Sequence, residues 1–189
     1  GLISKKSGRA ILKTTNTRYS GQDAYKVSLI SNSKGSARKV FRLDDTLSCI
    51  ISKDLVPLAF FKEAYEDDDY TKERITYSYP GNGKVSIRAI RHKNGNFKFD
   101  ETIIANKCTY DMVSVVTYAR TLDYQSMKKG SRNSIDFISG KKKLSMVIIH
   151  EGTEKLKVND GKTYNCIKLS LKISDDAFEN SEEAMKVYI

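Results

Sequence analysis

"CIKLSLKI" (residues 166–173) is the stretch of sequence that decides the fold class of this chain. Its apolar residues occupy every second position from Ile167 to Ile173, and lysine or serine occupies the positions between them. This period of two predicts a β-strand with one buried face and one solvated face.

The same alternation recurs along the chain, in "AYKVSLIS" (24–31) and "KVSIRAI" (84–90). Residues 94–95 (Asn-Gly) and 160–161 (Asp-Gly) favour type I′ hairpin turns, in which both central residues take positive φ. Hairpins join antiparallel neighbours, so we expect a long meander of about ten strands. Strand twist should curl such a sheet into a half-barrel or open barrel.

One segment, "CTYDMVSVVTYAR" (108–120), predicts a helix, with Thr109 or Asp111 placed to cap its first turn. Its apolar residues recur at the spacing of one buried helical stripe: Met112, Val115, Val116, Ala119 and Leu122. We interpret this helix as a plug for the core rather than as a ligand-binding element. The predicted fold is therefore mainly β, with one principal helix packed on the concave face of the curled meander.

Composition indicates one domain over residues 1–189, with 39% hydrophobic and 30% charged residues and only two prolines. A net charge of +10 permits anionic partners, although a solvated basic surface is the simpler interpretation. The longest apolar runs are far shorter than the roughly 20 residues of a membrane-spanning helix, so we expect no membrane span.

Sequence motifs for catalysis are missing, and we predict a non-catalytic protein without a cofactor. Neither His92 nor His150 has the spacing of zinc ligands, and no nucleophile elbow or phosphate-binding loop occurs. The candidates for a metal site, or for carboxylate chemistry on glycans, are four adjacent acids: Glu66, Asp67, Asp68 and Asp69. A solvated hairpin tip explains these acids more simply.

Tyrosines are the candidate ligand-lining residues, because aromatic rings on a concave sheet can hold an acyl chain or a sugar. The predicted lining joins strand and helix residues: Tyr65, Tyr77, Tyr79, Met112 and Val116. Tyrosine shares the apolar face rather than a basic platform, so we expect no nucleic acid partner.

The chain has three cysteines. Cys166 is in phase with the wet face of its strand, and Cys108 precedes the predicted helix. In an oxidising compartment, a disulfide between these two would stabilise the fold by roughly 4 kcal/mol in the chain-entropy model. In a reducing compartment both would stay as free thiols. Cys49 is predicted to be a packed free thiol.

Three segments together resemble a known family: residues 44–70, 106–123 and 157–173. Their most specific parts are "KDLVPL" (53–58), the "CTYDMVS" helix entrance and the "DGKTYNC" hairpin. In this order and spacing they resemble the domain of unknown function 3108, in its Bacteroidetes branch, over nearly the whole chain.

The resemblance implies a protein exported to the envelope of Gram-negative bacteria after removal of a signal peptide, and it favours the Cys108–Cys166 disulfide. It also implies that strands of a longer domain are missing at both ends of this chain. The family carries no assigned activity, so no catalytic residues are carried over.

We expect a non-catalytic module of the periplasm or outer membrane that binds a lipid-like or other apolar ligand, or docks an envelope protein. The alternatives are a carboxylate enzyme acting on envelope glycans and an anion-binding protein that acts through its basic surface.

Overall fold

The first sheet contains seven strands in chain order, and each neighbouring pair is antiparallel. The computed structural model describes residues 8–35, 42–158, 160–174 and 185–189. The strands of this sheet are β1 (Gly8–Tyr19), β2 (Gln22–Ser33), β3 (Leu43–Ser52), β4 (Pro57–Glu66), β5 (Asp69–Ser78), β6 (Val85–Lys93) and β7 (Asn96–Ala105). The predicted mainly β fold and the antiparallel meander are confirmed.

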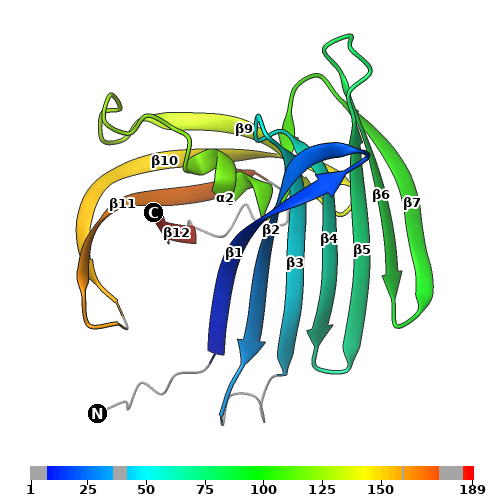
Figure 1. Ribbon diagram of the computed structural model, residues 1–189, viewed down its shortest axis with the longest axis horizontal. Coiled ribbons are helices and arrows are strands. Elements are labelled where there is room, and N and C mark those ends of the chain that lie inside the picture. Colours follow the sequence, from blue (N-terminus) through cyan, green and yellow to red (C-terminus); the bar gives the residue numbers. More distant parts are fainter. Residues whose placement is uncertain (1–7, 36–41, 159, 175–184) are drawn as a thin grey trace.

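A second sheet of five strands has the order β12-β11-β10-β9-β8. Its strands are β8 (Thr109–Tyr110), β9 (Arg132–Ser139), β10 (Lys142–Lys157), β11 (Thr163–Ser174) and β12 (Met185–Tyr188). Figure 1 shows this sheet curling across one end of the first sheet. Since β7 and β8 belong to different sheets, the described strands form an open arrangement and not a closed barrel.

The two predicted type I′ turns have different outcomes. Asn94 (φ 52°) and Gly95 (φ 77°) form the predicted two-residue turn between β6 and β7. The β10–β11 connection is longer, and residue 159 lies outside the described residues. Gly161 has φ 82°, and the Asp160 carboxylate accepts a hydrogen bond from the Lys162 N–H (2.8 Å), which makes a wider turn.

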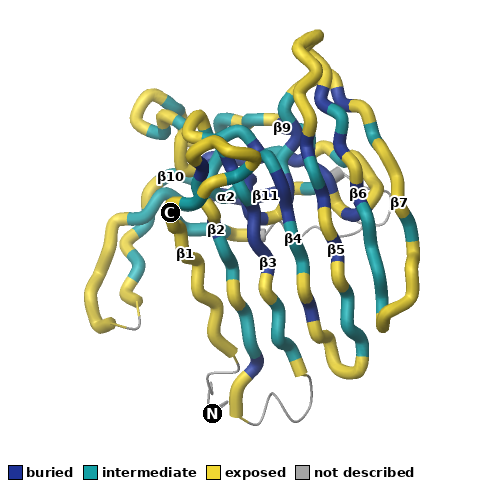
Figure 2. The backbone as a smooth tube through the Cα atoms, turned by 45° about the vertical axis from the view of Figure 1, so that its right-hand side comes forward, coloured by how far each residue is buried: buried dark blue, intermediate teal, exposed yellow. Residues whose placement is uncertain are grey.

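The alternating residues pack as predicted, in two apolar clusters. Val27, Ile75 and Ile87 belong to the cluster on the first sheet, and Leu169 and Leu171 belong to the cluster on the second. Figure 2 shows the buried residues concentrated on the central strands of the first sheet, whereas β1 is exposed along most of its length. The two clusters thus follow the two sheets, except that Ile138 of β9 packs in the cluster of the first sheet.

The helix is shorter than predicted and starts later. Residues 109–110 form the short strand β8, and the helix α2 spans only Ser114–Ala119. Met112 was assigned to the buried stripe, but it is 50% exposed, while Val113 is fully buried. The turn at Asp111, which precedes α2, rotates the chain so that Val113 and not Met112 meets the core.

The helix was predicted to pack on the concave face of the meander, and this prediction is only partly correct. Its buried residues Val115 and Ala119 pack in the cluster of the second sheet, whereas Val113 packs in the cluster of the first. The helix also contacts β3 of the first sheet. It therefore lies at the junction of the two sheets (Figure 1), where it covers the core of the second sheet and only one end of the first.

Candidate functional site

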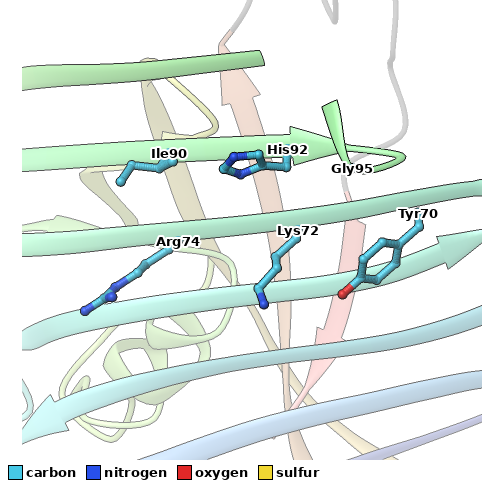
Figure 3. Close-up of a pocket in the computed structure, with 6 residues that line it drawn as sticks. All are labelled: Tyr70, Lys72, Arg74, Ile90, His92 and Gly95. Atoms are coloured by element: carbon cyan, nitrogen blue, oxygen red, sulfur yellow. The ribbon is translucent and has the colours of Figure 1, made fainter. Parts of the chain in front are cut away.

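An open pocket of about 420 Å³ lies on the first sheet, and Figure 3 shows the side chains around it. It is lined by Tyr70, Lys72 and Arg74 of β5, Ile90 and His92 of β6, and Gly95 of the following turn. Their intervening neighbours Glu73, Ile75 and Ala89 are buried. Strand alternation therefore places the pocket on the outer face, which points away from the core.

Two hydrogen bonds hold the β6–β7 turn against β5, one to the side chain of Asn94 and one from its backbone. The Tyr70 N–H donates to Oδ1 of Asn94 (2.7 Å), and the Asn94 N–H donates to the Tyr70 carbonyl oxygen (2.8 Å). Asn94 can make both contacts because the type I′ turn puts it at positive φ. The turn thus fixes Gly95 beside the Tyr70 ring at one end of the pocket.

The cations of the pocket have different partners. Lys72 Nζ lies 3.6 Å from Glu63 Oε1, an exposed ion pair. The Arg74 guanidinium lies 5.7 Å from the ring centroid of Phe61. No carboxylate of the described residues forms an ion pair with Arg74. Its positive charge is therefore available to an anion.

Aromatic rings border the pocket on two sides. The ring of Tyr70 stacks on that of Tyr65, with centroids 4.4 Å apart. The ring of His92 meets the edge of Phe97, with centroids 5.7 Å apart, and Phe97 is 62% exposed. Together with Ile90 these rings give the pocket an apolar surface beside its cations.

The five predicted ligand-lining residues do not form one site. Tyr77 is buried in the first core, and the Tyr79 hydroxyl donates to the Pro57 carbonyl oxygen (2.6 Å). Val116 packs against the second core, and Met112 is half exposed. Tyr65 borders the outer pocket through its stack on Tyr70. The spacing rules placed Tyr65 and Tyr77 on strands and Val116 on the helix, but Met112 precedes α2 and Tyr79 follows β5. These rules also could not show that the elements face different ways.

Asp111 is a fully buried carboxylate that organises the start of α2. Its Oδ1 accepts hydrogen bonds from the backbone N–H groups of Val113 and Ser114, both at 2.9 Å. The Asp111 N–H donates in return to Ser114 Oγ (2.9 Å), so the two residues cap the turn reciprocally. Of the two predicted cap residues, Asp111 makes these hydrogen bonds in the turn before α2, and Thr109 lies in β8. The N-cap residue of α2 itself is Val113, which has no side-chain cap hydrogen bond. Burial raises the pKa of Asp111, and its hydrogen bonds oppose that shift.

The acids proposed for a metal or for catalysis lie at the β4–β5 hairpin: Glu66, Asp67, Asp68 and Asp69. Asp67 Oδ1 accepts from the Arg42 N–H (2.8 Å), and Asp69 pairs with Lys93 (2.7 Å). The Lys93 ammonium and the Asn94 amide lower the pKa of Asp69. Within the described residues, no three His, Cys, Asp or Glu side chains are placed to hold a metal ion. The solvated hairpin tip is the arrangement that the structure contains.

The predicted disulfide is not formed, and all three cysteines are free thiols. Cys108 is half-buried between β7 and β8, where the hydroxyls of Tyr79 and Tyr110 interact with it. Cys166 lies opposite Glu154 in the β10–β11 hairpin, and its Sγ donates to the Tyr164 carbonyl oxygen (3.8 Å). Each thiol has its own partner. Cys49 is buried, as predicted.

The sequence contained a signal for the outer pocket that alternation alone could not use. "YTKER" (70–74) places Tyr70, Lys72 and Arg74 at every second position, and "IRH" (90–92) places Ile90 and His92 in the same way. Such a row is typical of any solvated strand face, so neither segment stands out by itself. The strand register, which pairs Lys72 with His92 and Arg74 with Ile90, brings these rows together.

In the part of the chain that the structure describes, no helix combines the length and the apolar character needed to span a bilayer.

Comparisons with known proteins assign a family. Neither the curated proteins nor the solved structures contain a match to this chain. One family does match, over residues 3–189, and its description is "Protein of unknown function (DUF3108)". The resemblance inferred from the sequence is thereby confirmed, and the chain belongs to the DUF3108 family.

Proposed function

We propose that this protein is a non-catalytic binding module that holds an amphipathic anion in the outer pocket of its first sheet. One observation carries the proposal: the guanidinium of Arg74 has no carboxylate partner among the described residues and stands beside an apolar surface. An anionic group would pair with Arg74, and an apolar chain would cover Ile90 and the Tyr70 ring.

The pocket suits an anion with an apolar part better than a simple salt ion. A small inorganic anion would use Arg74 but would leave Ile90 and the rings of Tyr70 and His92 exposed. Burying those surfaces contributes roughly 25 cal/mol per Å² of apolar area. The affinity should therefore rise with the length of the apolar chain.

The position of the four acids does not favour the alternative function, a carboxylate enzyme that cleaves glycans. The acids at 66–69 lie on an exposed hairpin tip, where Asp69 is paired with Lys93. Such an enzyme needs two carboxyl groups on either side of a substrate cleft.

Titration calorimetry with decyl phosphate, below its critical micelle concentration, tests the proposal. We expect saturable binding that Arg74→Gln weakens at least tenfold. Arg88→Gln is the matched control, because Arg88 lies on the same outer face but is held by Asp100 (2.6 Å) outside the pocket. Equal weakening by both variants would indicate diffuse attraction by the basic surface and would contradict the pocket.

We also propose that the protein works in the envelope of Gram-negative bacteria, as the family resemblance of the sequence implies. Fractionation of cells that produce the full-length protein tests this compartment. Recovery in the periplasm or with the outer membrane supports it, and recovery in the cytoplasm overturns it.

A further inference from the structure

An exposed aromatic ring continues the apolar side of the outer pocket onto the edge strand β7. Phe97 lies directly opposite His92 in the strand register, so the two side chains share the outer face. Their rings meet edge to face, with centroids 5.7 Å apart. Phe97 is still 62% exposed, more than any other large hydrophobic residue in the described part of the chain. Its ring therefore offers apolar area that the described structure does not cover.

The cations of the pocket lie on its opposite side. Figure 3 shows Lys72 and Arg74 extending from their strand away from the strand of His92. The Arg74 guanidinium lies 5.7 Å from the ring centroid of Phe61, which is the residue paired with Arg74 on β4. The outer face thus has a cationic side over β4 and an apolar side over β6 and β7. A ligand with one charged end and one apolar end would lie across the strands.

The apolar side is narrow along the strands. On β6 it consists of Ile90 and His92, which line the pocket. The next outward residue, Arg88, is held by Asp100, with Nη2 2.6 Å from Oδ2. The turn at residues 94–95 limits the surface at its other end. A second alkyl chain beside the first would have to cover the ion pair, and removing water from two charged groups is unfavourable.

We infer that the amphipathic anion has a single alkyl chain, which crosses β6 from Arg74 and ends on Phe97. This inference rests on the proposed function and assigns to Phe97 the selection of the chain. A long single chain covers Ile90, His92 and then the exposed ring of Phe97. Two short chains of the same total size would stop before this ring.

Two isomeric phosphodiesters test the inference: methyl nonyl phosphate, which has one long chain, and dipentyl phosphate, which has two short chains. The isomers have the same composition and the same single negative charge. We expect wild-type protein to bind methyl nonyl phosphate about tenfold more tightly in titration calorimetry, because only the long chain buries additional apolar area on Phe97.

Variants on β7 locate the end of the chain. Phe97→Ala should weaken the binding of methyl nonyl phosphate at least fivefold and leave that of dipentyl phosphate unchanged. Ile104→Ala is the matched control, because Ile104 is 54% exposed on the same strand but is paired with Ser86, outside the pocket. It should bind both isomers as wild type does. Arg74→Gln should weaken both isomers equally, since their charge is the same.

The outcomes separate this inference from the proposed function. Equal affinity of wild-type protein for the two isomers, or tighter binding of dipentyl phosphate, overturns the single chain and leaves the amphipathic-anion site standing. Binding of neither isomer overturns both proposals. Equal affinities of Phe97→Ala and Ile104→Ala for methyl nonyl phosphate overturn the role of Phe97. A dimer in sedimentation velocity that Phe97→Ala dissociates would assign the exposed ring to a second copy of the chain and overturn the inference.

Discussion

The hydroxyl of Tyr77 donates a hydrogen bond to Oδ2 of Asp111 (3.2 Å) in the interior of the protein. This bond joins strand β5 of the first sheet to the turn that starts α2, across 34 residues of sequence. Burial raises the pKa of both groups, because each charged form loses its hydration. The Tyr77–Asp111 hydrogen bond therefore fixes the start of the helix against the first sheet. It does so with a buried carboxylate, whose charged form is disfavoured by the loss of hydration.

Asp111→Asn should change how stability depends on pH. Because the pKa of Asp111 is raised on folding, the native state binds more protons than the unfolded state between the two pKa values. The contribution of this carboxyl to stability is thus greatest at low pH and falls as pH rises through its folded pKa. Urea unfolding from about pH 4 to about pH 7 should show wild type losing stability relative to Asp111→Asn.

The exposed Asp54 supplies the control for that experiment. Asp54→Asn should follow the wild-type pH profile. A stability difference between wild type and Asp111→Asn that stays constant or grows with pH would contradict the buried, raised carboxyl.

Substitutions at the start of α2 should distinguish the observed helix from the one that the sequence predicted. Val113→Ala should lower the free energy of unfolding by about 2 kcal/mol, because it removes two methyl groups from a fully buried site. Met112→Ala should change it by no more than about 0.5 kcal/mol, because this side chain is half exposed. Chemical unfolding of both variants measures the contrast, and the reverse order would restore the predicted stripe.

Gly140 should tolerate alanine less well than Gly35, although both have φ 58°. A Cβ at Gly140 would lie 2.9 Å from Nη2 of Arg91, whereas nothing lies within 4 Å at Gly35. Arg91 cannot move away freely, because it pairs with the buried Glu73. Gly140→Ala should therefore cost about 1–2 kcal/mol more than Gly35→Ala in thermal or urea unfolding. An equal loss of stability in the two variants would mean that backbone strain alone, and not contact with Arg91, destabilises Gly140→Ala.

His150→Leu should stabilise the protein. The His150 side chain packs against the Tyr124 ring (5.3 Å between centroids), and neither ring nitrogen has a hydrogen-bond partner among the described residues. Leucine removes two unsatisfied polar atoms and keeps an apolar contact, so we expect a gain of about 1 kcal/mol in the free energy of unfolding. His92→Leu, on the outer face, should give no comparable gain. Loss of stability in His150→Leu would show that the imidazole has a polar partner in solution.

The strand content and the strand faces could be predicted because they depend on local features. Alternation identified the buried faces of β2, β6 and β11, and Asn94-Gly95 identified a hairpin turn. The helix was predicted less well. Its apolar spacing was compatible with several starting points, and the capping hydrogen bonds of Asp111 select one of them.

The candidate site was largely beyond the reach of the sequence. Tyr65, Tyr77 and Tyr79 were grouped because they lie on adjacent strands, but Tyr65 belongs to the outer face and Tyr77 to the core. The lysine, arginine and histidine of the outer pocket looked like ordinary solvated positions. Only pairing between β5 and β6 shows that they border one pocket.

By itself, then, the sequence determined the mainly β fold, the meander, the family and the buried cysteine at position 49, because patterning and composition act over a few residues at a time. The tertiary structure alone decided the division into two sheets, the place of α2 between them and the free state of Cys108 and Cys166. It also decided which outward side chains meet on the first sheet. These features depend on register and packing between segments that are distant in the chain, and no local pattern encodes them.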